Sequence, residues 1–239
     1  MSMKNKPVGL IVAENLATAE VFEAFGIDFC CHGHQTLEES CNALAINIEQ
    51  IEFELKAAEE KSSISSVSDV SNMAVDELAR DIVAVHHSYM WSALPKVASR
   101  FETVIKVHGA RHPELLIIQK DFGLLRDELE SHLEKEEKVL FPFIEAMTVA
   151  AREHQPRPHS CFDKIADPIA MMKEEHESAG AALERMRKVA GNYQVPPDAC
   201  NTFRLLYKEL QELEYDLHVH IAKENYLLFP KSLKLESEF

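Results

Sequence analysis

The sequence predicts an all-α protein in which a small N-terminal helical domain precedes an antiparallel four-helix bundle. Two observations carry this prediction. The 239 residues include only 7 glycines and 10 prolines, too few for the many tight turns of a β-sandwich or barrel. From Met73 onward, apolar positions recur at alternating spacings of three and four, which is the period of helices packed in a bundle.

The N-terminal domain, residues 1–60, contains start and stop signals for three short helices. The first, Leu16 to Phe25, stops at a glycine. The second opens with the capping-box pattern Thr36-x-x-Glu39, and Asn47 gives the start signal of the third. Residues 61–72, KSSISSVSDVSN, are serine-rich and lack a helical period, so they predict a linker. The bundle then covers residues 73–239.

Four stripes of core-facing positions define the helices of the bundle. Pro142 predicts the end of the second helix, and Gly191 that of the third. The stripes are Val83, His87, Met90, Leu94, Val97, Phe101 and Val104; Phe122, Leu125, Leu129, His132, Glu136 and Val139; Ile169, Met172, His176, Ala179, Leu183, Met186 and Ala190; and Leu206, Leu210, Leu213, Leu217, His220, Glu224 and Leu227.

The bundle repeats internally. The pattern His-x-x-Lys-Glu-x-x-x-Leu-Phe-Pro begins at His132 and again at His220, an offset of 88, while His87 and His176 differ by 89. Each half therefore gives one histidine from its first helix and a His-x-x-x-Glu pair from its second. The repeat predicts a site with pseudo-twofold symmetry.

The six polar residues on the stripes predict a metal centre. Residues four apart share a helix face, and a carboxylate buried there without compensation is costly. A lone stripe histidine is more often a hydrogen-bonded core residue, but four stripes agree here. We expect two ions held by His87, His132, His176 and His220, with Glu136 and Glu224 bridging as candidate catalytic residues. Nitrogen-rich ligands favour iron or manganese over calcium or magnesium, and zinc also fits.

The remaining histidines fall off the stripes. We interpret His86 and His218 as outer-shell or surface residues, and expect His108, His112, His154 and His159 to be solvated in connecting segments. Three acids are candidates for an outer shell or an access path to the metal, because each is one turn before a ligand or directly adjacent to one: Glu128, Glu175 and Asp216.

Net charge and cysteine content limit the classes of binding partner and predict the cellular compartment. Twenty-five basic against 40 acidic residues give a net charge of −15, the wrong sign for gripping nucleic acid or an anionic membrane. The N-terminus has no apolar signal region. Five cysteines, an odd number, predict reduced thiols and a cytoplasmic protein.

Five segments together resemble a known family: Asp28–Gly33 with its Cys-Cys-His, His86–Pro95, Ser131–Pro142, Glu175–Gly180 and His220–Pro230. They are similar to the iron-sulfur cluster repair di-iron proteins of the RIC family (YtfE/ScdA type), over nearly the whole chain. The resemblance implies a hemerythrin-like bundle and a non-haem di-iron centre, carboxylate-bridged and oxo-bridged when oxidised. It implies the same six ligands as the stripes, and a role in recovery from nitrosative and oxidative stress.

Adjacent Cys30 and Cys31 lie in the loop of the N-terminal domain, beside His32 and His34. They are either ordinary small residues or an exposed pair for redox chemistry or iron transfer. A disulfide between adjacent cysteines is strained, and the side chains of these two cysteines and two histidines are too crowded to surround one zinc ion. Transient metal binding or transfer is therefore the favoured interpretation of the second alternative. Cys41, Cys161 and Cys200 are interpreted as structural.

Three functions stay open at this point. The first is repair of damaged iron-sulfur clusters, by reaction with nitric oxide (including reduction to nitrous oxide, an oxidoreductase activity) or by iron donation to iron-sulfur client proteins. The second is a hemerythrin-like sensor that binds oxygen or nitric oxide without turnover. The third is a metal-free structural bundle. The resemblance implies one histidine fewer than in oxygen-carrying hemerythrins, which favours reactive chemistry. A homodimer is a further candidate assembly.

Overall fold

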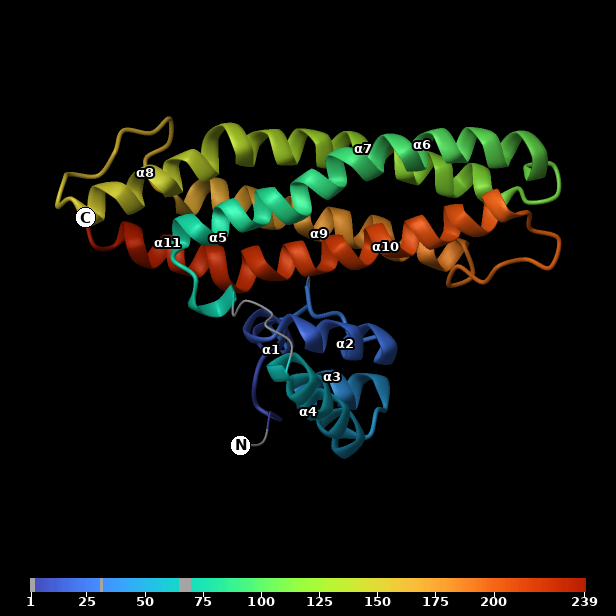
Figure 1. The fold of residues 1–239 in the computed structure, drawn as a ribbon, viewed down its shortest axis with the longest axis horizontal. Coiled ribbons are helices and arrows are strands. Elements are labelled where there is room, and N and C mark those ends of the chain that lie inside the picture. The colour runs from blue at the N-terminus through green and yellow to red at the C-terminus, as the bar shows by residue number, and fades with distance from the viewer. Residues whose placement is uncertain (1–2, 31, 65–69) are drawn as a thin grey trace. The chain divides into compact units, whose positions relative to one another are not determined.

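The computed structural model describes residues 3–30, 32–64 and 70–239, and Figure 1 shows its helices. Positions 65–69 of the predicted linker lie outside the described residues. Among those described, the β-type pairing is one isolated bridge, between Pro7 and Thr36. The elements are α1 (Val8–Glu14), η1 (Leu16–Thr18), α2 (Ala19–Phe25), α3 (Leu37–Leu44), α4 (Ile48–Ile64), η2 (Val70–Asn72), α5 (Val75–Ile82), η3 (Val83–His87), α6 (Ser88–His108), α7 (Glu114–Lys135), η4 (Glu136–Leu140), α8 (Phe141–Arg152), α9 (Ala166–Val189), α10 (Asn201–Lys223), η5 (Glu224–Leu228) and α11 (Phe229–Glu236).

The N-terminal helices begin and end where their punctuation predicts. Gly26 closes α2 with a left-handed φ of 69°, which a glycine adopts without steric cost. The Thr36 hydroxyl accepts the Glu39 N–H at 3.2 Å while the Glu39 carboxylate accepts the Thr36 N–H at 2.8 Å, completing the capping box of α3. Helix α1 was not expected from the sequence, because its seven residues are too short to show a period.

The chain divides into two compact units. Unit 1 comprises Met1–Arg80, Ile144–Ile165 and His218–Phe239, and unit 2 comprises Asp81–Phe143 and Ala166–Leu217. This division cuts across the long helices. The separation into residues 1–60, 61–72 and 73–239 therefore stays a prediction.

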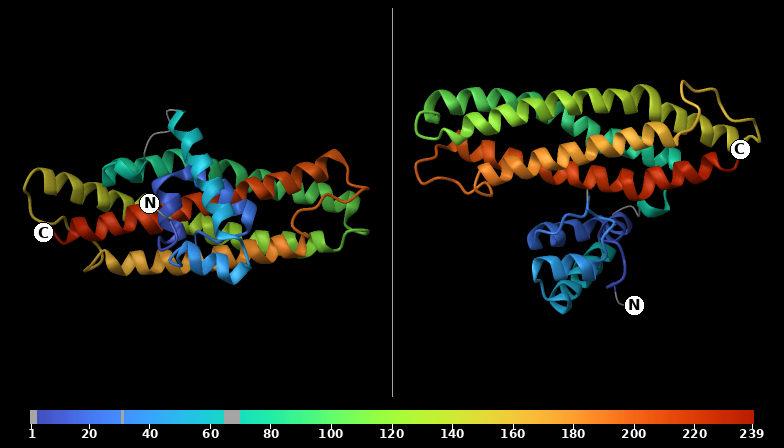
Figure 2. Two further views of the ribbon diagram at one scale, coloured as in Figure 1. Left: turned by 90° about the horizontal axis from the view of Figure 1, so that it is seen from below. Right: turned by 180° about the vertical axis from the view of Figure 1, so that it is seen from behind.

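Unit 2 is built from four long helices that lie side by side: α6, α7, α9 and α10 as far as Leu217 (Figures 1 and 2). Aromatic rings fill its interior, with centroids 5.4 Å apart for Phe101 and Phe122 and 4.9 Å apart for Phe203 and Tyr207. The residues of all four stripes are buried, except Val83 and Val139. The predicted four-helix bundle is confirmed.

The long helices contain three π-helical turns, η3, η4 and η5, of which η4 explains the exposure of Val139 and η3 begins at Val83. The Phe141 N–H bonds to the Glu136 carbonyl and the Phe229 N–H to the Glu224 carbonyl, a five-residue step that inserts one residue and shifts the helix phase. Val139 is therefore 40% exposed, and Leu140 is buried in its place. The prediction that Pro142 ends the second helix was wrong, because the chain continues as α8 immediately after the π turn.

Unit 1 is tied together by contacts between its three chain segments. The Asp76 carboxylate on α5 pairs with Arg152 on α8 at 3.0 Å and with Arg80 at 2.9 Å. Gly9 on α1 lies so close to Tyr226 on η5 that a Cβ at Gly9 would come within 2.2 Å of the ring. The Tyr226 hydroxyl also donates to the Cys30 carbonyl at 3.4 Å.

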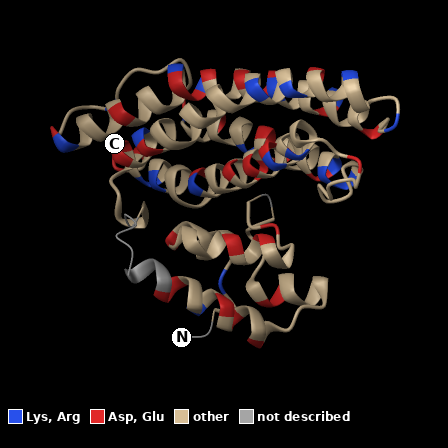
Figure 3. Cartoon of the chain, turned by 45° about the vertical axis from the view of Figure 1, so that its right-hand side comes forward, with Lys and Arg blue, Asp and Glu red and all other residues tan. Residues whose placement is uncertain are grey.

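Charged residues of both signs are distributed along the helices (Figure 3). The connection from α8 to α9 carries exposed His154, His159 and Cys161, and Cys200 is exposed as well. None of the described helices combines the length and apolarity that a membrane crossing requires.

Candidate metal centre

Four ligand-type side chains of unit 2 converge in its interior. His87 ends η3, His132 lies in the last turn of α7, Glu136 opens η4 and His176 lies on α9. All four are buried, with exposed fractions between 0% and 3%. They come from three different stripes, so packing of the helices brings the four together.

The Glu136 carboxylate is the centre of this group. Its Oε2 lies 3.4 Å from His87 Nε2 and 3.4 Å from His132 Nε2. His132 Nε2 in turn lies 3.3 Å from His176 Nε2. Metal–ligand bonds of about 2.0–2.2 Å place neighbouring ligand atoms at such separations. One oxygen of the Glu136 carboxylate therefore faces imidazoles from two segments.

His220 and Glu224 form the corresponding pair in unit 1. His220 Nε2 lies 2.8 Å from Glu224 Oε1, and both side chains are fully buried. His220 lies in the last turn of α10 and Glu224 opens η5, as His132 and Glu136 do for α7 and η4. The sequence repeat therefore extends to the backbone, including the π turn that begins at each glutamate.

Two carboxylates orient the imidazoles from outside the group. His132 Nδ1 donates to Glu175 at 2.8 Å, and His87 Nδ1 donates to Glu137 at 3.0 Å. The Trp91 indole N–H also donates to Glu137, at 2.9 Å. In a neutral ring, a proton kept on Nδ1 by these carboxylates leaves Nε2, which faces Glu136, available to a metal.

The pKa of Glu175 reflects this role. The hydrogen bond from His132 and the smaller effect of Lys135, which forms an ion pair with the same carboxylate, together lower this pKa to about 2 against the opposing effect of partial burial. Glu175 therefore stays ionised at neutral pH. An ionised carboxylate on Nδ1 makes the imidazole a stronger ligand.

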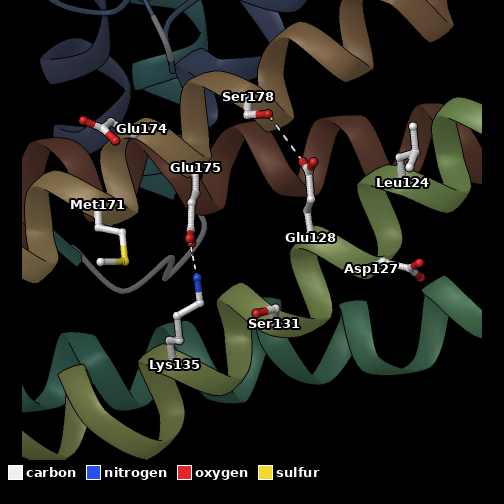
Figure 4. A pocket seen from close by; sticks show the side chains of 9 residues that line it. All are labelled: Leu124, Asp127, Glu128, Ser131, Lys135, Met171, Glu174, Glu175 and Ser178. Carbon is white, nitrogen blue, oxygen red and sulfur yellow. Dashed lines mark hydrogen bonds and ion pairs between the residues drawn. The ribbon is translucent and has the colours of Figure 1, made fainter.

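The other two predicted outer-shell acids bond to residues that are not proposed ligands. Glu128 accepts a hydrogen bond from Ser178 at 3.4 Å. Asp216, which is partly exposed, pairs with buried His86 at 2.9 Å, whereas Glu128 is exposed. Glu128 and Glu175 both line a pocket between α7 and α9, together with Leu124, Asp127, Ser131, Lys135, Met171, Glu174 and Ser178 (Figure 4).

Cys30 does not have the exposure that the loop predicted. Its side chain is buried, and its thiol donates to Asp28 at 3.2 Å. The other Asp28 oxygen bonds to His32 at 2.6 Å. Cys31 lies outside the described residues, so the role of the pair in redox chemistry or iron transfer stays a prediction.

Comparisons with known proteins match both parts of the chain. The hemerythrin HHE cation-binding domain matches residues 78–232, and ScdA_N, described as a domain of unknown function (DUF542), matches residues 4–59. The iron-sulfur cluster repair protein YtfE of Cronobacter sakazakii is 31% identical over 233 residues, covering 98% of each chain. Those of Edwardsiella ictaluri and Escherichia coli are 32% and 30% identical, each over 98% of this chain and 99% of the relative. The chain belongs to the YtfE family of iron-sulfur cluster repair proteins.

In this member of the family, sequence reasoning missed Glu137 and left the partner of Glu175 open. Glu175 directly precedes His176, and its partner is His132 on the neighbouring helix. Glu137 follows a ligand and bonds to a histidine 50 positions away. Both pairings depend on which helix faces which, and helical periodicity within one segment carries no signal for that. The π turns were missed for a related reason, because the repeated Leu-Phe-Pro after each glutamate was taken only as a helix end.

Proposed function

We propose that this chain holds two iron ions and uses them to repair damaged iron-sulfur clusters in client proteins. The proposed ligands are His87, His132, His176 and His220, with Glu136 and Glu224 bridging. The observation that carries the proposal is the buried Glu136 carboxylate, 3.4 Å from an imidazole nitrogen on each side. The identical placement of His220 and Glu224 in the second repeat supports a matching second half.

The donor set suits iron. Four imidazoles and two carboxylates favour a transition ion over calcium or magnesium. A bound iron pair supplies redox chemistry and open coordination positions for a small ligand such as nitric oxide or oxygen. The chain's own residues hold the ligand geometry: Glu137 and Glu175 keep the Nδ1 protons of His87 and His132, and apolar neighbours such as Phe141, stacked 5.5 Å from His87, exclude water.

Two reactions would serve repair, namely reduction of nitric oxide to nitrous oxide and donation of iron. Nitric oxide should be added without oxygen to the reduced, iron-loaded protein, and the gas phase analysed. Nitrous oxide that is absent with the Glu136→Ala protein supports reduction. Iron appearing in an apo iron-sulfur protein mixed with the loaded chain supports donation. A ligand-bound spectrum with neither product would instead assign the chain as a sensor.

The pocket between α7 and α9 is our proposed path for iron. Its lining includes four acids and one lysine (Figure 4), and Glu175 connects it to His132. Glu128→Leu should slow iron uptake by the apo protein and chelator-driven loss from the loaded protein, because Glu128 lies on the path and bonds to Ser178, not to a ligand. Glu175→Leu should change both rates and affinity.

Glu130 on α7 offers a matched control, since this exposed acid lies outside the pocket lining. Glu130→Leu should leave both rates unchanged. Equal rates for Glu128→Leu and the unmodified protein would remove Glu128 from the path.

Cys30, Cys41, Cys161 and Cys200 are all free thiols, which supports action in the reducing cytoplasm.

A further inference from the structure

A second cluster of ligand-type side chains lies at the other end of α6. It consists of His108, the last residue of α6, His112 in the turn before α7, and Asp198 in the connection from α9 to α10. One potential ligand atom of each residue lies within 4.8 Å of those of the other two. His108 follows His87 by 21 residues, which is about 30 Å along a helix. The cluster is therefore separate from the proposed iron centre.

His108 is the unusual member. Sequence reasoning expected a solvated residue, but its side chain is buried, with 3% of its surface exposed. Neither ring nitrogen has a hydrogen-bond partner among the described residues. Its ring is packed 5.3 Å from Phe203 and 6.1 Å from His112. Buried polar groups almost always have a partner, so this imidazole points to a ligand.

The other two members are held in place for binding. The His112 N–H bonds to the His108 carbonyl at 2.9 Å, which continues the helical turn and sets both imidazoles on one side. His112 Nδ1 bonds to Glu114 at 2.9 Å, and its Nε2 lies 3.0 Å from Asp198 Oδ1. Arg111 pairs with the other Asp198 oxygen at 3.0 Å.

Glu114 holds Nδ1 of His112 and Arg111 holds Oδ2 of Asp198. The atoms that face each other in the cluster are therefore His112 Nε2 and Asp198 Oδ1, which form a hydrogen bond at 3.0 Å that a bound ion would replace. A carboxylate behind a ligating histidine is the usual support of a metal site. The 3.0 Å between Nε2 and Oδ1 is close to the separation of two ligands on one tetrahedral ion.

We propose that His108, His112 and Asp198 bind a divalent transition-metal ion of the zinc type. Two imidazoles and one carboxylate select such an ion over calcium or magnesium. Three protein ligands leave a fourth position for water. The bound ion joins the α6–α7 turn to the α9–α10 connection, and so fixes the end of unit 2 that lies away from the proposed iron centre.

The test uses iron-loaded protein of the full chain, titrated with Zn²⁺ against a chelating indicator, with iron content measured before and after. We expect one zinc per chain in addition to the iron. Asp198→Asn, in an exposed connection, should weaken zinc binding at least tenfold, because replacing even a supporting residue costs 10–100-fold. His108→Gln should do the same, and Co²⁺ in place of zinc should show the strong visible bands of a tetrahedral site.

Two controls separate this site from other sources of zinc binding. Arg111→Gln removes the ion pair but none of the proposed ligands, and Cys200→Ser removes an exposed thiol two positions from Asp198. Both should bind zinc within a few-fold of the unmodified protein. The proposal would be overturned if the iron-loaded protein bound no zinc in addition to its iron. It would also be overturned if Asp198→Asn and His108→Gln bound zinc as tightly as the unmodified protein. Unchanged iron content in all variants shows that each is folded.

Discussion

Glu136 and its surroundings show how single residues can prepare the proposed metal site. A metal ion held between Glu136 and two imidazoles needs an unprotonated Nε2 on each ring, and this tautomer is selected at the other nitrogen, Nδ1. Glu137 and Glu175 make that selection from the edge of the bundle, where each is partly exposed. The ligands and their supports therefore come from different helices.

The first prediction concerns these supporting carboxylates. Glu137→Gln and Glu175→Gln should each weaken iron binding by about 10–100-fold, because an amide holds the Nδ1 proton less strongly and leaves the imidazole a poorer ligand. Chelator competition on the reduced protein measures this. Glu134→Gln is the matched control, since Glu134 pairs with Lys138 on the exposed side of the same segment. Equal affinities in all three variants would contradict the assigned role.

At the scale of elements, the π turns determine where the core positions fall. After the glutamate of η4 the apolar stripe resumes one position later, at Leu140 instead of Val139, whereas in η5 both Leu227 and Leu228 are buried. The turns also accommodate Pro142 and Pro230 without ending the helix. At η4, a period of 3.6 therefore describes the stripe before the turn and fails after it.

Contacts of α1 with η5 give the second prediction. Gly9→Ala should destabilise unit 1 by about 1–3 kcal/mol, because the new methyl would overlap the Tyr226 ring and overpacking costs that much. Gly123→Ala on α7 is the control: nothing lies within 4 Å of its Cβ position, so it should be neutral or stabilise by up to about 1 kcal/mol. Thermal unfolding of both variants measures the difference. Equal shifts in unfolding temperature for the two variants would contradict the close packing of Gly9 against Tyr226.

The ion pairs between α5 and α8 give the third prediction. Although burial alone would raise the pKa of Asp76, its bonds to Arg80 and Arg152 lower it below the usual value of 3.8. A lowered carboxyl pKa stabilises the fold above the unfolded-state pKa, and that contribution is lost as the pH falls through the folded-state value. Asp76→Asn should therefore cost about 1–3 kcal/mol at pH 7.

Urea unfolding as a function of pH checks this. The difference between Asp76→Asn and the unmodified protein should be constant from pH 7 to about 5, and should shrink below pH 4. Glu145→Gln, which removes a longer, exposed pair with Arg80, should shift stability by less than about 0.5 kcal/mol. A difference that persists undiminished at pH 2 would contradict the ionic origin.

At the scale of the whole molecule, much of the architecture could be predicted because it depends on local patterns. Alternating spacings of three and four predicted the four long helices, Thr36 and Glu39 predicted a cap, and the repeat at 88 positions predicted matching His-Glu pairs. Glu137, the burial of His108 and the burial of Cys30 could not be predicted. Each depends on which segments pack together, and one sequence carries no signal for such pairings.

Metal removal gives the fourth prediction. The proposed iron would bind the folded protein and not the unfolded chain, so its removal should lower the unfolding temperature. Without it, the six proposed ligands would lose their common partner. Calorimetry of apo and reloaded protein measures the shift, with His86→Ala as a variant that should load and respond like the unmodified protein. Identical unfolding temperatures for apo and loaded protein would contradict the coupling.

The central claim is that Glu136 and Glu224 bridge two iron ions. Iron analysis of the purified protein, of Glu136→Ala and of Glu224→Ala tests it most directly. His86→Ala is the control, because it removes a buried histidine that is not one of the proposed ligands. The account predicts two iron ions per chain in the unmodified protein and in His86→Ala, and loss of iron in both glutamate variants. Full retention of two iron ions in Glu136→Ala and Glu224→Ala would contradict it.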